Sequence, residues 1–130
     1  MTHPNEERTR AGLDAFARGD LAALDDLFAD DIDWHVPGRS PLAGDYHGKQ
    51  EVYGFLAKTQ ELSGGTFRLE VHDVLASDDH VVVLTIGHAE RGGTSFTNPG
   101  VQVVHFRDGK LAESWFHPLD QYAVDEFWSS

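Results

Sequence analysis

The sequence of 130 residues contains no cysteine, one methionine and no long hydrophobic run. Without cysteine the chain can form neither a disulfide framework nor a thiolate zinc site, and it has no cysteine nucleophile. Apolar runs such as residues 81–84 are far too short to span a membrane, and residues 1–20 lack the apolar core of a signal peptide. We therefore expect a protein that is not secreted and that resides in the reducing cytoplasm.

Basic residues are also few. The 10 lysines and arginines stand against 22 aspartates and glutamates, which gives a formal net charge of −12 at pH 7. Because phosphate binding depends on Lys and Arg contacts that release counterions, we expect neither a nucleic acid nor a membrane as a partner. The hydrophobic share of 40% is that of an ordinary globular protein, and the length fits one domain over residues 1–130.

Helices are predicted where apolar residues recur at intervals of three and four. These segments are residues 5–18, 21–30 and 49–62. Gly19 can supply the left-handed residue that ends the first helix, and Asp20 is a suitable N-cap for the second. The first two helices are therefore expected to form an amphipathic hairpin.

Strands are predicted where the apolar period becomes two. Residues 32–36 form one short strand, and residues 39–48, which contain proline and glycine, form a loop. From Thr66 onward the alternation continues, and turn signals at residues 77–80, 91–93 and 108–109 divide it into four antiparallel strands. Residues 119–128 form a short helix or an ordered tail.

The predicted hairpins assign side chains to the two faces of the sheet. A two-residue turn at Asp108-Gly109 places Gln102, Val104, Trp115 and His117 on one face. A turn at residues 78–79 adds Phe67, Leu69, Ile86 and His88 to the same face. We expect helices to cover this face and a small-molecule pocket to form there. The opposite face, with Val101, Val103, His105, Ala112, Ser114 and Phe116, is apolar enough for a subunit contact.

This order of elements and several local motifs resemble a known family. The motifs are Gly19-Asp20-Leu21, Leu27-Phe28-Ala29-Asp30-Asp31, Trp34-His35-Val36-Pro37-Gly38, Pro41-Leu42-Ala43-Gly44 with Gly48, and Asp108-Gly109-Lys110-Leu111. Together they resemble SnoaL-like members of the nuclear transport factor 2 superfamily. The resemblance implies an α+β cone, in which a curved antiparallel sheet wraps around a pocket and three helices from the N-terminal half close it. It also implies a homodimer formed through the outer sheet face.

The superfamily includes ketosteroid isomerases, but the resemblance does not extend to their catalytic residues. A count without gaps places the isomerase base at Val36, the tyrosine of the first helix near Gly12, and the protonated carboxyl near Val103 or Val104. An isomerase needs a proton acceptor and preorganised donors for the enolate oxygen, so ketosteroid isomerisation is disfavoured. A shift of one residue would place His35 at the base position.

Polyketide cyclases of the SnoaL type resemble the end of the chain, where an acid/base aspartate after the last strand would correspond to Asp120. His117 precedes it by three residues and is a candidate for an imidazole oriented by this carboxylate. His88, with Glu90 on the same face, is the next candidate. The alternative roles are structural: Asp120 caps the last helix, His117 lines the rim of the pocket, and His88 is a hydrogen-bonded core residue.

The eight histidines do not form a metal-binding motif, because no predicted element carries two of them at ligand spacing. An alternative is a metal site across strands, formed by His88 and His117 with Glu90 or Glu113. There is no glycine-rich phosphate loop and no nucleophile elbow. We therefore predict that the protein uses neither a metal nor a cofactor.

The ligand-binding residues that we predict are Trp34, Tyr46, Phe55, Phe67, Leu69, Ile86, Gln102, Val104 and Trp115. Their apolar and aromatic character favours a small hydrophobic molecule. The first functional hypothesis is a cofactor-independent lyase, isomerase or cyclase for a small hydrophobic carbonyl compound, with Asp120 as proton shuttle and His117 or His88 assisting. The second is a non-catalytic protein that binds a small hydrophobic ligand. A third is an interaction module that uses the outer sheet face.

Overall fold

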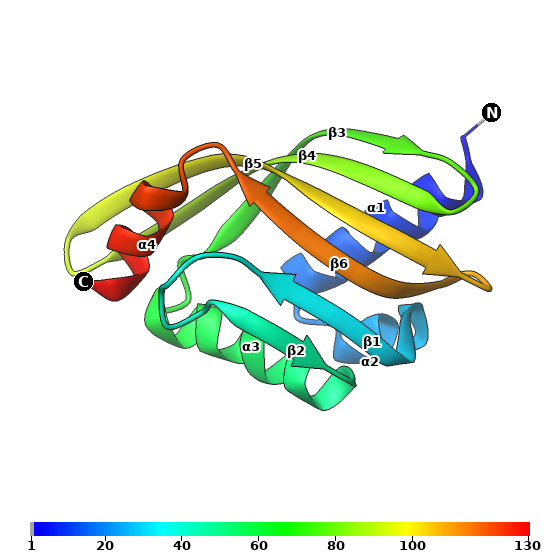
Figure 1. Cartoon of the computed structure of the whole chain (residues 1–130), viewed down its shortest axis with the longest axis horizontal. Coiled ribbons are helices and arrows are strands. Elements are labelled where there is room, and N and C mark those ends of the chain that lie inside the picture. Colours follow the sequence, from blue (N-terminus) through cyan, green and yellow to red (C-terminus); the bar gives the residue numbers. More distant parts are fainter. Residues whose placement is uncertain (1) are drawn as a thin grey trace.

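A computed structural model describes residues 2–130, which form four helices and one curved sheet of six strands. The elements are α1 (Pro4–Arg18), α2 (Leu21–Leu27), β1 (Phe28–Val36), β2 (Gly44–His47), α3 (Lys49–Leu62), β3 (Arg68–Ala76), β4 (His80–Arg91), β5 (Thr94–Arg107), β6 (Lys110–Pro118) and α4 (Gln121–Ser129). In Figure 1 the sheet curves over α1, α2 and α3, and α4 lies beside the end of β6. The predicted α+β class and wrapped sheet are confirmed.

The strands follow the order β2-β1-β6-β5-β4-β3 across the sheet. All neighbours are antiparallel except β1 and β6, which run parallel, whereas we expected an antiparallel sheet throughout. Two boundaries also differ from the prediction. β1 begins at Phe28, so α2 is shorter than expected, and β2 lies in the segment that we predicted as a loop.

The expected local signals act at the ends of elements. Gly19 adopts a left-handed φ of 70° after α1, and the Asp20 carboxylate accepts a hydrogen bond from the Ala23 backbone N–H at 3.1 Å. The turn between β5 and β6 uses φ angles of 54° at Asp108 and 76° at Gly109. Positive φ at both central residues is the requirement of a type I′ hairpin, so the predicted turn is confirmed.

Irregularities in two hairpins decide which side chains face inward. Next to the Asp108-Gly109 turn Phe106 pairs with Leu111, as predicted, but the following pair is His105 with Glu113. The extra residue, Ala112, forms a β-bulge, which exchanges the two faces of the rest of β6. A second bulge at His72 shifts the register between β3 and β4 in the same way.

The main core lies between the helices and the concave face of the sheet. Its most deeply buried members are Ala15 of α1, Ile32 of β1, Val52 of α3, and Val81 and Val83 of β4, each with 0% exposure. A second, smaller cluster of Leu42, Ala89, Phe127 and Trp128 joins α4 to the sheet. Within residues 2–130, no helix combines the length and the apolar character needed to cross a membrane.

Candidate functional site

A cavity of about 180 Å³ lies between the concave face of the sheet and the helices. Side chains from all four helices reach its wall. Its aromatic lining residues are Phe16, Phe28, Trp34, Phe55, Phe67, Phe116 and Trp128. Its aliphatic lining residues include Leu13, Leu24, Leu27, Val36, Leu42, Leu56, Leu69, Val104, Leu111 and Val124. A concave, mostly apolar hollow of this kind is the usual form of a small-molecule site.

Trp34 packs against three other aromatic rings of the wall. Its ring centroid lies 5.4 Å from that of Phe116, 5.9 Å from that of Phe28 and 6.2 Å from that of Phe55. These tilted arrangements are the favourable geometry of aromatic pairs. The indole N–H of Trp34 is buried, and no described group accepts a hydrogen bond from it.

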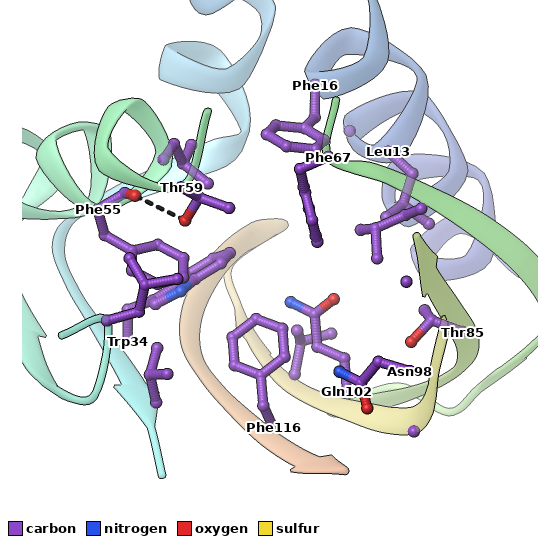
Figure 2. A pocket seen from close by; sticks show the side chains of 18 of the residues that line it. Leu13, Phe16, Trp34, Phe55, Thr59, Phe67, Thr85, Asn98, Gln102 and Phe116 are labelled. Carbon is purple, nitrogen blue, oxygen red and sulfur yellow. Dashed lines mark hydrogen bonds between the residues drawn. The ribbon is translucent and has the colours of Figure 1, made fainter. Parts of the chain in front are cut away.

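Polar side chains in the wall fall into two sets. The hydroxyls of Thr9 and Thr59 donate to backbone carbonyls of their own helices, at 2.8 and 2.9 Å, and are therefore satisfied within the protein. Thr85, Asn98 and Gln102 form the second set, which we call the polar cluster. Figure 2 shows these three side chains together on one side of the cavity, with Trp34 and Phe55 on the other.

None of the described residues that line the cavity carries an ionisable side chain. The positions of the three candidate catalytic residues explain this. Asp120 is exposed and caps α4, where its carboxylate accepts a hydrogen bond from the Ala123 backbone N–H at 3.1 Å. His117 is exposed on the outer sheet face, and His88 lies there within 3.1 Å of a Glu70 carboxylate oxygen. The expectation that these residues meet in the pocket is wrong.

Six of the predicted ligand-binding residues line the cavity: Trp34, Phe55, Phe67, Leu69, Gln102 and Val104. Tyr46 lies behind the wall, where its ring packs at 5.1 Å against Phe55 and its hydroxyl donates to the Leu42 carbonyl. Burial also raises the pKa of the Tyr46 hydroxyl. Ile86 and Trp115 belong to the outer face, contrary to the prediction.

The bulge at Ala112 explains the corrections on β6. It directs Phe116 and Ser114 inward and Trp115 and His117 outward, so the phenyl ring of Phe116 takes the place in the wall that we had assigned to Trp115. It also removes Ala112, Ser114 and Phe116 from the apolar outer face that we expected.

On β4 the prediction chose the wrong face. Thr85 and Gly87 line the cavity in place of Ile86 and His88. Both faces of this strand are apolar near its start, because Val81 and Val83 alternate with Val82 and Leu84, so periodicity does not distinguish them. Thr85 and Asn98, which sequence analysis missed, carry no sequence signal beyond their polar side chains in an otherwise apolar segment.

The outer face holds a charged network instead. His35 lies with its Nδ1 at 2.6 Å from an Asp45 carboxylate oxygen and its Nε2 at 2.7 Å from one of Glu113, and its ring stacks on Trp115. The two carboxylates, first of all Asp45, raise the pKa of the His35 imidazole. Within residues 2–130, no group of three or more His, Asp or Glu side chains is placed to hold a metal ion.

Comparisons with known proteins agree with this architecture. The family model for the SnoaL-like domain matches residues 9–114. The uncharacterised protein Rv0034 of Mycobacterium tuberculosis (strain ATCC 25618 / H37Rv) is 33% identical over 116 residues, which cover 88% of each chain. The structure of Bal32a, from a soil-derived mobile gene cassette, superposes with a TM-score of 0.93 at 37% identity and covers 96% of both chains.

A further similar structure is that of TerC, which was co-crystallised with polyporic acid. It is 26% identical, has a TM-score of 0.86, and the alignment covers 98% of this chain and 100% of TerC. The family match extends over most of the chain, and the fold agrees with solved structures described as cystatin-like and NTF2-like. The chain therefore belongs to the SnoaL-like domain family of the nuclear transport factor 2 superfamily.

Proposed function

We propose that the protein binds a small hydrophobic molecule in the cavity and does not itself transfer a proton to or from it. One observation carries this proposal: a cavity of about 180 Å³ with an aromatic and aliphatic wall in which no described side chain is ionisable. A general acid or base must lie within hydrogen-bond reach of the proton that it moves. The wall supplies shape and apolar surface, which suffice for binding.

The size of the cavity suits a ligand of one or two rings. A cavity of roughly 150 Å³ lined by apolar side chains is enough to bind benzene. The co-crystallisation of the structurally similar protein TerC with polyporic acid supports the idea that an organic molecule occupies this scaffold.

The alternative is the acid/base lyase, isomerase or cyclase with Asp120, His117 and His88 as its catalytic residues. It would require at least one of these side chains to reach the ligand, and all three lie outside the cavity wall. The binding hypothesis needs no such rearrangement, so we favour it.

Calorimetric titration with ethylbenzene tests the proposal. Gly87 lines the cavity, and an added Cβ there would meet only ordinary contacts, at 3.6 Å from Phe67 and 3.7 Å from Asn98. Gly87→Leu should therefore fold and fill part of the cavity. We expect the wild type to bind ethylbenzene and Gly87→Leu to bind it about tenfold more weakly or not at all.

The matched control is Gly54→Leu. Gly54 is exposed on α3, and a Cβ at this position would have no neighbour within 4 Å. This variant should keep the wild-type affinity. Equal binding by wild type and Gly87→Leu would show that ethylbenzene does not enter the cavity, and no binding by the wild type would contradict the proposed function.

A further inference from the structure

The polar cluster lies at a part of the sheet where two of its members pair with glycines. On the concave face, Thr85 pairs with Gly100 across β4 and β5, and Asn98 pairs with Gly87. Each polar side chain therefore faces a position without a side chain. In Figure 2 the amide of Gln102 lies between Phe116 on one side and Thr85 and Asn98 on the other. It points into the cavity, toward Phe67.

The hydrogen-bonding capacity of the polar cluster is incompletely used within the protein. Gln102 is only 6% exposed, and its Nε2 donates to the Ser114 hydroxyl at 2.9 Å. No described group bonds the carbonyl oxygen of Gln102 or the side chains of Thr85 and Asn98. Among the described side chains, the Trp34 indole N–H is the only fully buried polar group without a partner, so the unbonded atoms of the polar cluster are open to the cavity. A polar group of a ligand that meets the cluster would replace water there and form hydrogen bonds that an apolar group cannot form.

The charge of the surroundings restricts that polar group further. The described cavity wall contains no cation that could balance an anionic ligand, and it contains no carboxylate that could balance a cation. Burying an isolated charge in an apolar cavity is strongly unfavourable. An ionised carboxylic acid is therefore strongly disfavoured at the polar cluster, as is an ammonium group.

The chemistry of the polar cluster completes the argument. Primary amides and a threonine hydroxyl both donate and accept hydrogen bonds. A ligand hydroxyl does the same, so it can donate to the free carbonyl oxygen of Gln102 and accept from Asn98 or Thr85. Across the cavity, Trp34 and Phe55 provide the surface for an aromatic or alicyclic ring.

We propose that the ligand is an uncharged, hydroxyl-bearing ring compound whose hydroxyl binds to Thr85, Asn98 and Gln102 while its ring packs against the aromatic wall. This inference rests on the proposed function, because it names the class of ligand for the same cavity. It predicts a specific order of affinities among ligands that share an ethyl-substituted benzene ring.

The test compares three probes by calorimetry at pH 7: ethylbenzene, para-ethylphenol and para-ethylbenzoate. The wild type should bind the phenol about tenfold more tightly than ethylbenzene, which is the scale of one or two net hydrogen bonds. It should not bind the benzoate measurably. Thr85→Val keeps the shape of the side chain but removes its hydroxyl. It should lower the affinity for the phenol several-fold and leave the affinity for ethylbenzene unchanged.

A second variant removes the central amide. Because Gln102→Met alone would leave the buried Ser114 hydroxyl without its partner, the double variant Gln102→Met/Ser114→Ala replaces both partners of that bond. It should lower the affinity for the phenol several-fold and leave the affinity for ethylbenzene unchanged, because Thr85 and Asn98 remain but the carbonyl acceptor is gone. The control is Gln50→Met, the same change on the exposed surface of α3, which should keep the wild-type preference.

The outcomes separate this inference from the proposed function. If ethylbenzene binds in the cavity but the phenol binds no more tightly, or if the benzoate binds as well, the cavity is a binding site. The assignment of a ligand hydroxyl to the polar cluster is then wrong. A preference for the phenol that is as large in Thr85→Val and in the double variant as in the wild type overturns the assignment as well. If none of the three probes binds, the proposed function fails together with this inference.

Discussion

The ion pairs of His35 predict a stability that falls as the pH rises. His35 connects three strands, because it lies on β1 and contacts Asp45 of β2 at 2.6 Å and Glu113 of β6 at 2.7 Å. Both ring nitrogens face carboxylate oxygens, and the pKa of the imidazole is raised above its ordinary value of about 6.5. The folded state therefore binds the proton more tightly than the unfolded state does.

The magnitude follows from the exposure of the partners. Asp45 has a side chain that is 84% exposed, so its contact contributes only a few tenths of a kcal/mol. Glu113 and His35 are 33% and 30% exposed, and their contact is worth up to about 1 kcal/mol. Together they should contribute up to about 1.5 kcal/mol. This contribution is complete below pH of about 6.5 and disappears as the pH rises through the raised pKa of folded His35.

Urea unfolding followed by tryptophan fluorescence measures the effect. His35→Gln should lower the free energy of unfolding by up to about 1.5 kcal/mol at pH 5.5 and by much less at pH 8.5. The matched control is His72→Gln, because His72 is exposed at the bulge of β3 and has no described hydrogen bond. A loss in His35→Gln that is the same at both pH values would refute the reasoning, since the imidazolium would then not be the stabilising species.

Three further predictions concern stability and assembly. Trp34→Phe should change the free energy of unfolding by less than about 1.5 kcal/mol in urea titrations, because the removed indole N–H has no partner, whereas Trp34→Ala should lose about 3 kcal/mol or more. Asp120→Ala should lower the free energy of unfolding by about 1 kcal/mol, and with it the melting temperature, because it removes the N-cap of α4. We still expect a homodimer through the outer face, where Ile86 and Val103 lie; light scattering should show a dimer for the wild type and a monomer for Val103→Asp, and a wild-type monomer would contradict this.

The order of the elements could be predicted from sequence because local signals fix it. Gly19, Asp20 and the Asp108-Gly109 turn each act through their own backbone or side chain, and the structure uses all of them as expected. β2 was missed because its four residues follow a segment rich in proline and glycine. It is a strand only through its pairing with β1, which is a tertiary interaction.

The faces of the strands were harder to predict, because one extra residue reverses them. Leu111 faces the core as expected, and the bulge at Ala112 then directs Phe116 inward and His117 outward. The residue types of β6 do not indicate the bulge, because aromatic or apolar residues occur on both faces of this strand. The candidate site was therefore correct in its apolar wall near Trp34 and Phe55 and wrong in its acid/base residues.

Gln102→Glu would show directly that the cavity excludes charge. The new carboxyl would occupy a position where Gln102 is 6% exposed and where no cation lies in the described wall, so burial should raise its pKa well above the ordinary value of about 4.3. The unfolded chain releases this proton at lower pH than the folded one. Relative to wild type, the variant should therefore lose stability as the pH rises above about 4.3, by about 1.4 kcal/mol per pH unit until the folded group ionises.

Urea unfolding of Gln102→Glu and wild type between pH 4 and pH 8 measures this slope, and Gln50→Glu on the exposed surface of α3 is its control. A flat difference across this range would mean that water or a mobile cation reaches the polar cluster. A charged ligand could then bind there as well, and the argument for an uncharged, hydroxyl-bearing ligand would lose its electrostatic basis. A rising loss of stability would instead show that the cavity admits a polar group only in its neutral form.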